Sequence, residues 1–385
     1  MATNETRRKA SRYVVPVAVA GVAAATIGLV PALAAAGDPD LPEITAQQLI
    51  EKIAASDTQT LSGTFKISTD LGLPSFAGLI PSDSSSASAD PSARLTELAS
   101  GTHTLRVAAD GPDRQKLTVL DGSDEYSLIH NGADVWAYDS KSNEVFHEKA
   151  DGPAGPPEKE LPGTPKELAD EVLKAAGDTT SITVGGTAKV AGRDAYQLVI
   201  KPKQSGSTVE SVKIAVDAAT GTPLKFTLDS TSGGKPVVDA GFTKVDFGRP
   251  AASTFDFKAP KGAKVTEGAA EKEAGKHDEL PEGLEGLEGL FGGKDGKGGE
   301  GLNVIGEGWT AVAKLDTGAP APKTDEAPKE VQGFLDSFGD KVSGKFGTGT
   351  VFKTKLVNAL MTDDGKVYVG AVTPDALVKA ADSGK

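Results

Sequence analysis

Alternating apolar and polar positions dominate the first two thirds of the chain and predict a long series of β-strands. The first strands are expected at 64–68, 104–107, 115–120, 125–129 and 134–138. Turn residues such as Asp121-Gly122 and Asn131-Gly132 separate neighbouring segments. A period of two that is bounded by such turns is typical of hairpins, so the pattern predicts an antiparallel meander.

Two short helices accompany the predicted strands. Thr45 and Gln48 form a capping box at the start of the first helix, and Thr164-Pro165 begins the second, which Gly177 ends. Alternation then resumes at 181–184, 195–200, 212–216, 224–228 and 241–247. The many hairpins favour antiparallel pairing, so we expect one large curved sheet with two helices, a mainly β fold of the α+β class.

The composition divides the chain into four parts. Residues 1–36 place Arg7 to Arg12 before an apolar run that ends in Ala32-Leu33-Ala34, a pattern that predicts a cleaved export signal or an uncleaved N-terminal membrane anchor. Residues 43–260 hold the predicted sheet. Residues 261–302 are rich in Gly, Glu and Lys and predict a flexible linker, and residues 303–380 predict a small C-terminal α+β module.

The predicted module combines a helical stripe with two strands. Val331, Phe334, Leu335, Phe338 and Val342 recur at helical spacing and predict a helix over 328–342. Strands at 350–360 and 366–372 follow, and Thr373-Pro374 begins a last short helix. These strands are too few for a second barrel.

Several short sequence segments resemble the LolA and RseB (MucB) proteins, a superfamily of periplasmic lipoprotein carriers and regulators. Residues 131–145 and 362–374 resemble actinobacterial LolA-like proteins, and residues 190–198 and 214–224 are also similar to stretches of the RseB (MucB) regulators. The resemblance implies a half-open antiparallel β-barrel that is covered by helices and encloses an apolar cavity.

The resemblance also implies two functions. LolA ferries lipoproteins, so the first is a non-catalytic carrier or chaperone that binds an acyl chain, a lipid or a lipidated protein in the cavity. RseB binds an anti-sigma factor, so the alternative is an envelope-stress regulator that binds such a factor or another membrane-anchored protein. Both imply an exported protein, secreted or associated with the cell envelope, with membrane contact through residues 1–36 if they are not cleaved.

Apolar residues that share one face of each strand are the candidates for lining the cavity. They are Leu105, Val107, Tyr126, Leu128, Trp136, Tyr138, Tyr196, Leu198, Ile200, Val212, Ile214 and Val216. The alternative is that this face is packed core beneath the helices. Two short helices leave part of so large a sheet uncovered, which favours a cavity.

Charge and residue content narrow the class of partner. Without residues 1–36, which hold four basic residues and one acidic residue, the net charge is −16, so no nucleic-acid partner is expected. With no cysteine, the chain has no disulfide, thiolate metal site, cysteine nucleophile or lipoprotein acylation site.

No motif of catalysis or cofactor binding stands out. The four histidines, His103, His130, His147 and His277, lack the spacing of a zinc protease. A zinc site of His103 and His130, or a catalytic pair among the many carboxylates, remains an alternative. The sequence predicts no catalytic residue, no metal and no cofactor, and therefore no enzyme.

Overall fold

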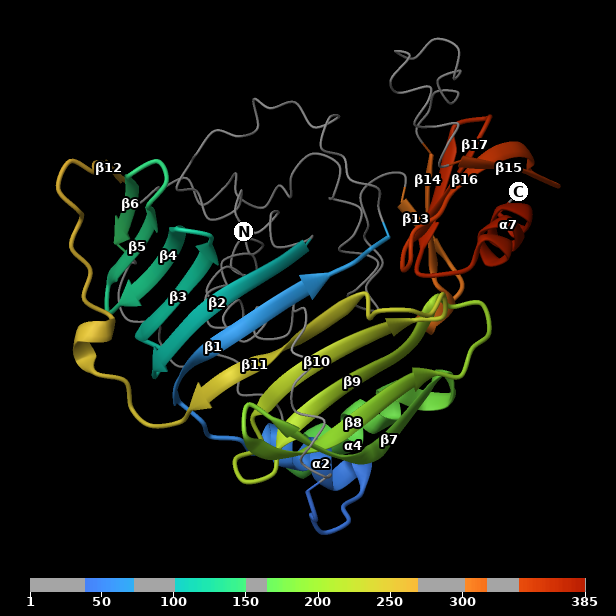
Figure 1. Ribbon diagram of the computed structural model, residues 1–385. Helices are drawn as coiled ribbons and strands as arrows, with labels where there is room; N and C mark the ends of the chain where they lie inside the picture. The colour runs from blue at the N-terminus through green and yellow to red at the C-terminus, as the bar shows by residue number, and fades with distance from the viewer. Residues whose placement is uncertain (1–38, 73–100, 150–164, 269–301, 317–338, 385) are drawn as a thin grey trace, which may run out of the picture.

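The computed structural model describes residues 39–72, 101–149, 165–268, 302–316 and 339–384 (Figure 1). The predicted export signal at 1–36 lies outside these residues. Within them the chain forms two β-sheets, one of twelve strands and one of six.

The large sheet is built from two antiparallel runs that meet in its middle. Its strand order is β12-β6-β5-β4-β3-β2-β1-β11-β10-β9-β8-β7. The strands are β1 (Thr60–Thr69), β2 (Gly101–Asp110), β3 (Arg114–Asp121), β4 (Asp124–Asn131), β5 (Asp134–Asp139), β6 (Glu144–Lys149), β7 (Thr180–Val190), β8 (Arg193–Pro202), β9 (Val209–Asp217), β10 (Pro223–Ser230), β11 (Val238–Asp246) and β12 (Lys264–Glu267). The edge strands β12 and β7 do not pair with each other, so the predicted mainly β, half-open sheet is confirmed.

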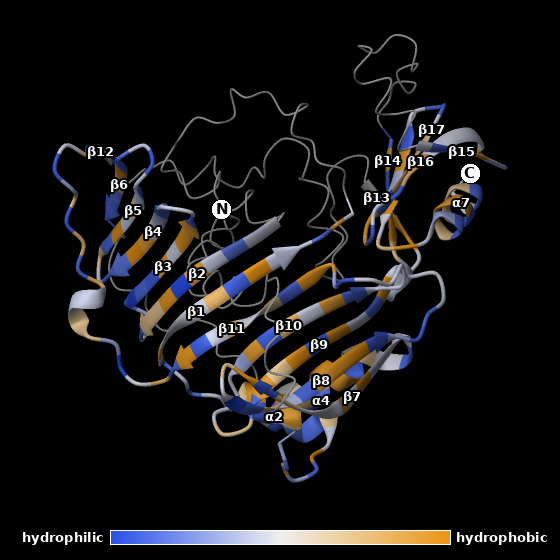
Figure 2. Ribbon diagram, in the orientation of Figure 1, coloured by the Kyte–Doolittle hydropathy of each residue, from blue (hydrophilic) through white to orange (hydrophobic). Residues whose placement is uncertain are grey.

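Tight turns set the register of the first run. Asn131 pairs with Asp134 across a two-residue turn in which Gly132 has a φ of 65°. Such a positive φ favours glycine, as the Asn-Gly sequence predicted. Hydrophobic and hydrophilic residues alternate along these strands (Figure 2).

Two helices pack near the β7 edge of the large sheet. Helix α2 (Ala46–Ala54) begins with the predicted capping box, in which Thr45 and Gln48 each accept a hydrogen bond from the other's backbone N–H. Helix α4 (Pro165–Ala176) lies beside it, and both contact β7 (Figure 1). Their position leaves the other end of the sheet without a cover from the described helices.

The chain returns to the far edge of the sheet after β11. The segment passes through the short 3-10 helix η5 (Ala252–Thr254), buries Phe255 completely and ends as β12, which pairs in parallel with β6. Their polar composition predicts that residues Lys264–Glu267 belong to the flexible linker, but these residues form β12 and pair with β6. Backbone hydrogen bonds to β6 hold these residues, which need no apolar side chains for this role.

The small sheet has the order β13-β14-β18-β17-β16-β15 and carries helix α7 (Pro374–Ser383) on one face. Its strands are β13 (Leu302–Ile305), β14 (Val312–Asp316), β15 (Gly339–Gly344), β16 (Gly347–Phe352), β17 (Asn358–Thr362) and β18 (Lys366–Gly370). The helix predicted over 328–342 is wrong at its end, because residues 339–342 belong to β15; residues 328–338 lie outside the described part.

The small sheet is joined to one end of the large sheet by backbone hydrogen bonds. Thr208 N–H donates to the Ala371 carbonyl at 2.9 Å, and Thr373 N–H donates to the Gly206 carbonyl at 2.8 Å. Trp309 adds a side-chain bond from its indole N–H to Thr180 at 2.7 Å. The two sheets therefore lie in direct contact along the described chain.

Candidate functional site

Ten of the twelve predicted lining residues share one face of the large sheet. Leu105 and Val107 pair with Val119 and Leu117, which in turn pair with Tyr126 and Leu128. At the other end, Tyr196, Leu198 and Ile200 pair with Val216, Ile214 and Val212. The registers through β10, β11 and β1 connect the two groups, since paired residues in antiparallel strands point to the same side. We call this side the inner face.

Trp136 and Tyr138 lie on the opposite face. The two-residue turn after Asn131 pairs Trp136 with Ile129, not with Leu128. Trp136 and Tyr138 therefore point to the side opposite Leu128, whereas the sequence pattern predicts that they line the same face as Leu128. The Trp136 ring stacks on His147 at 3.6 Å and lies 5.4 Å from the ring of Phe257. These two aromatics thus pack beneath the returning segment that leads to β12.

Helices α2 and α4 cover the β8–β9 end of the inner face. Leu49, Ile50 and Ala169 from the helices form a buried cluster with Tyr196, Leu198 and Val216. Ile200 and Ile214 pack against this cluster and stay half-buried. At this end the inner face is therefore packed core, the alternative that the sequence left open.

The rest of the inner face is apolar and only half-buried. Phe65, Ile67, Leu105 and Phe242 form its buried base, with the rings of Phe65 and Phe242 5.1 Å apart and edge to face. Around this base lie apolar side chains that remain partly exposed to solvent: Leu61, Val107, Leu117, Val119, Leu128 and Phe226. We call these six residues the open patch.

Sequence reasoning identified Val107 and Leu128 but missed the other four members of the open patch. Each of the four sits at an apolar position of an alternating strand. Counting residues across the short turns between the strands would have placed Leu117 and Val119 beside Leu105. Placing Phe226 on the same face as Leu61 required the pairing of β1 with β11, which no local pattern predicts.

A shallow pocket with a volume of about 570 Å³ opens beside α2. Ile44, Glu51, Lys52 and Tyr196 are among its lining residues. Tyr196 is the one member of the predicted lining set that reaches it, and its hydroxyl donates to the Pro42 carbonyl at 3.0 Å. Because charged side chains line it, this pocket differs in chemistry from the predicted apolar cavity.

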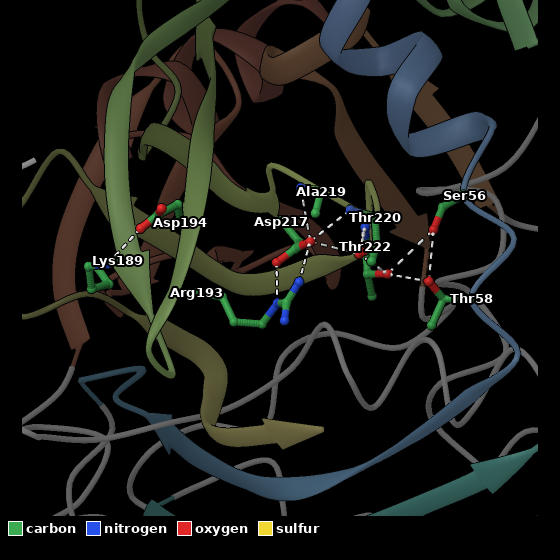
Figure 3. Close-up of polar contacts among 9 residues, drawn as sticks. All are labelled: Ser56, Thr58, Lys189, Arg193, Asp194, Asp217, Ala219, Thr220 and Thr222. Carbon is green, nitrogen blue, oxygen red and sulfur yellow. Dashed lines mark hydrogen bonds and ion pairs between the residues drawn. The ribbon is translucent and has the colours of Figure 1, made fainter. Parts of the chain in front are cut away.

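A buried ion pair fixes the β9–β10 turn next to this region (Figure 3). Asp217 is 1% exposed and accepts hydrogen bonds from Arg193, from the Thr220 backbone N–H at 2.7 Å and from the Thr220 hydroxyl at 2.9 Å. Burial raises the pKa of Asp217, but the bonds from Arg193 and Thr220 outweigh it and hold that pKa below its usual value. With every oxygen satisfied, this carboxylate has a structural role.

Thr222 extends the same network to the segment after α2. Its hydroxyl lies 2.8 Å from that of Thr58 and 3.4 Å from that of Ser56 (Figure 3). The turn and the helix are thereby held in one position at the covered end of the inner face.

His147 occupies a polar site on the face opposite the open patch. Its Nδ1 lies 2.7 Å from a carboxylate oxygen of Glu267 on β12, and its Nε2 lies 2.8 Å from Asp134. Each ring nitrogen faces a different carboxylate, so the site ties β12 to the sheet. His103 and His130 lie on β2 and β4, and the described residues contain no group of three side chains able to hold a metal ion.

Comparison with known proteins gave matches among solved structures only. No family model matches the sequence, and no curated protein matches it. The solved structures to which this chain is similar include MucB and a LolA-superfamily protein.

MucB in complex with MucA(peri) matches with a TM-score of 0.38 and 16% identity, over 87% of this chain and 97% of that one. The Pseudomonas aeruginosa MucA/MucB complex matches with a TM-score of 0.37 and 18% identity, over 87% and 96%. A LolA-superfamily protein from Nitrosomonas europaea matches with a TM-score of 0.22 and 11% identity, over 56% and 99%.

Proposed function

We propose that the protein is a non-catalytic, extracytoplasmic carrier that binds an acyl chain, free or attached to a lipoprotein, on the open patch. The observation that carries the proposal is the open patch itself. Its six apolar side chains are each partly exposed, and the described helices contact the sheet only at its β7–β8 end. Apolar side chains that cluster on one face and remain accessible to solvent favour a binding site for an apolar ligand.

The energetics favour a long hydrocarbon chain as the ligand. Each buried methylene contributes about 0.8 kcal/mol, so ten of them contribute about 8 kcal/mol, which corresponds to a dissociation constant of about 1 μM before the cost of ordering the chain. The open patch offers hydrocarbon side chains for such contacts and no ion pair that a ligand would have to break.

Displacement of a fluorescent fatty acid tests this proposal with a matched pair of variants. Leu117→Gln places an amide on the open patch, while Lys116→Gln changes the neighbouring residue on the opposite face of β3. We expect Leu117→Gln to weaken binding about tenfold, since a buried amide without a partner costs about 1–3 kcal/mol, and Lys116→Gln to bind as the wild type does. Equal melting temperatures for the two variants would exclude an effect of unfolding.

Native mass spectrometry of the protein from its own host provides the complementary test. Copurified acyl species would support the carrier function. Absence of bound lipid together with absence of fatty-acid displacement would refute it.

The contact between the two sheets supports a second candidate function, an envelope-stress regulator of the RseB (MucB) type. The hydrogen bonds from Thr208 and Thr373 join the units proposed at 43–260 and 303–380 into one surface that a partner protein can span. MucB, one of the structural neighbours, was crystallised with MucA. Recovery of a transmembrane regulatory protein from native membranes would favour this function, and recovery of lipid alone would favour the carrier.

A further inference from the structure

Three polar side chains beside the open patch carry buried atoms without a hydrogen-bond partner. The atoms are Oδ1 of Asp113, Oε1 of Gln115 and Nδ1 of His130, and none of them has a partner among the described residues. Gln115 is 8% exposed, while Asp113 and His130 are half-buried. Nearly all buried polar atoms in folded proteins form a hydrogen bond, so three exceptions close together in one sheet favour a ligand site. We call these three residues the polar row.

The strand registers place the polar row on the inner face. Gln115 of β3 pairs with His130 of β4, and these strands are neighbours in the sheet (Figure 1). The next pair on the same side is Leu117 and Leu128, two members of the open patch. Because two residues of a strand span about 7 Å, one ligand can contact both pairs.

Asp113 lies at the end of the same ladder. Its carbonyl accepts a hydrogen bond from the Gly132 N–H at 2.8 Å, next to the pair of Gln115 and His130. The Gln115 Nε2 donates to the Pro112 carbonyl at 3.4 Å, near the upper limit for a hydrogen bond. A bond of this length opposes rotation of the Gln115 amide only weakly, so its oxygen can turn toward a ligand.

The unpartnered atoms of the polar row match a hydrogen-bond donor. The amide oxygen of Gln115 and the carboxylate oxygen of Asp113 have lone pairs and no proton, so they only accept hydrogen bonds. The Nδ1 of His130 also accepts when the ring proton is on Nε2. A hydroxyl or an amide N–H of a ligand therefore fits this site.

The charges of the inner face disfavour an anionic headgroup. Within the described strands β2 to β5, no inner-facing position holds Lys or Arg, whereas Asp121, Asp124 and Asp139 occupy that side. Arg114, the basic residue nearest to the polar row in the sequence, lies on the opposite face and pairs with Asp110 at 2.7 Å. Carboxylates without a basic neighbour on the same face repel a ligand that carries a carboxylate or a phosphate.

We propose that the polar row binds the headgroup of an uncharged acyl compound through hydrogen bonds from its hydroxyl or amide N–H, while the acyl chain lies on the open patch. This inference rests on the proposed carrier function and names the class of ligand for it. One hydrogen bond to a buried acceptor that otherwise stays unpaired changes the affinity about tenfold. The polar row therefore selects among ligands that have the same hydrocarbon chain.

Displacement of a fluorescent fatty acid by ligands with one acyl chain tests the selection. Monolaurin has hydroxyl donors, methyl laurate is uncharged and has no donor, and laurate is an anion. For the full-length protein we expect monolaurin to bind about tenfold more tightly than methyl laurate, with laurate no tighter than methyl laurate. N-methyl lauramide offers an amide N–H and shows whether that donor replaces the hydroxyls.

The outcomes separate this inference from the carrier function. If methyl laurate or laurate binds as tightly as monolaurin and N-methyl lauramide, the assignment of the polar row is overturned and the carrier function stands. If none of the four ligands displaces the fluorescent fatty acid, both proposals fail.

A matched pair of variants assigns the selection to the polar row. Gln115→Leu should lower the preference for monolaurin over methyl laurate from about tenfold to about twofold or less, and Gln197→Leu, the same exchange on the opposite face of β8, should keep it. Gln115→Leu should also melt no lower than the wild type, because hydrocarbon replaces a buried acceptor without a partner. His130→Phe should lower the preference in the same direction. An unchanged preference in both Gln115→Leu and His130→Phe would overturn the inference, and since the preference compares two ligands on one variant, a loss of folded protein cannot mimic it.

Discussion

Replacement of Asp217 by Asn should destabilise the protein strongly and in a way that depends on pH. The carboxylate is 1% exposed, pairs with Arg193 and accepts three further hydrogen bonds from Ala219 and Thr220. Removing one partner of a buried pair costs about 3–5 kcal/mol. Arg193 keeps some contact with water, so we expect the lower end, about 3 kcal/mol, or a fall in Tm of roughly 6–12 °C.

The dependence on pH follows from the direction of the pKa shift. The folded state lowers the pKa of Asp217, so the stability that this carboxylate contributes is fully present above its unfolded-state pKa of about 3.9. It disappears as the pH falls through the lower folded-state pKa. The gap in Tm between the wild type and Asp217→Asn should thus be constant from pH 7 to about 5 and should narrow below about pH 4.

Thermal unfolding followed by circular dichroism at several pH values measures both effects. Asp194→Asn is the matched control, because Asp194 pairs with Lys189 at 2.6 Å on the surface of the β7–β8 hairpin, which also carries Arg193 (Figure 3). An exposed pair contributes about 0–1 kcal/mol, so this variant should melt close to the wild type. The reasoning would be refuted if the two variants melted alike, or if the gap for Asp217→Asn were the same at pH 3 and pH 7.

Two further substitutions test other parts of the fold. Gly221→Ala should lower stability by about 1–3 kcal/mol, because Gly221 has a φ of 76° and an added Cβ would lie 2.3 Å from the Lys52 carbonyl. Gly234→Ala should lower stability less, because Gly234 has a φ of 85° but open space around the added Cβ. Chemical denaturation of both variants therefore separates the clash with Lys52 from the backbone strain. Trp136→Ala should cost about 3 kcal/mol through its lost contacts with His147 and Phe257, and an unchanged Tm would show that this packing adds nothing.

Local sequence patterns correctly predicted the strands of the first run and their order in the sheet. Alternation and turn residues predicted β2 to β5 because each contact joins neighbouring segments. The register of Trp136 could also be predicted from the sequence. It follows when Asn131 is paired with Asp134 across the two-residue turn and the residues are counted outward from that pair. Treating each strand separately therefore placed Trp136 and Tyr138 on the wrong side relative to Leu128.

Long-range pairing could not be predicted in this way. β12 consists of exposed residues and pairs with β6, about 120 residues earlier, so neither hydrophobicity nor a nearby turn indicates it. The open patch depends on the pairing of β1 with β11, which lie about 180 residues apart. Such contacts are decided by the packing of the whole sheet, and an alternating segment is compatible with many partners.

The parallel strand β12 has a practical consequence for shortened forms of the protein. A chain cut at residue 260, where polar composition suggests that the folded part ends, would lack β12 and would leave the N–H and C=O groups along one side of β6 facing water. An unprotected strand edge of this kind recruits further copies, so such a fragment would be expected to self-associate into oligomers or precipitate. Extension to Gly268 retains both the capping strand and the carboxylate of Glu267 that His147 contacts.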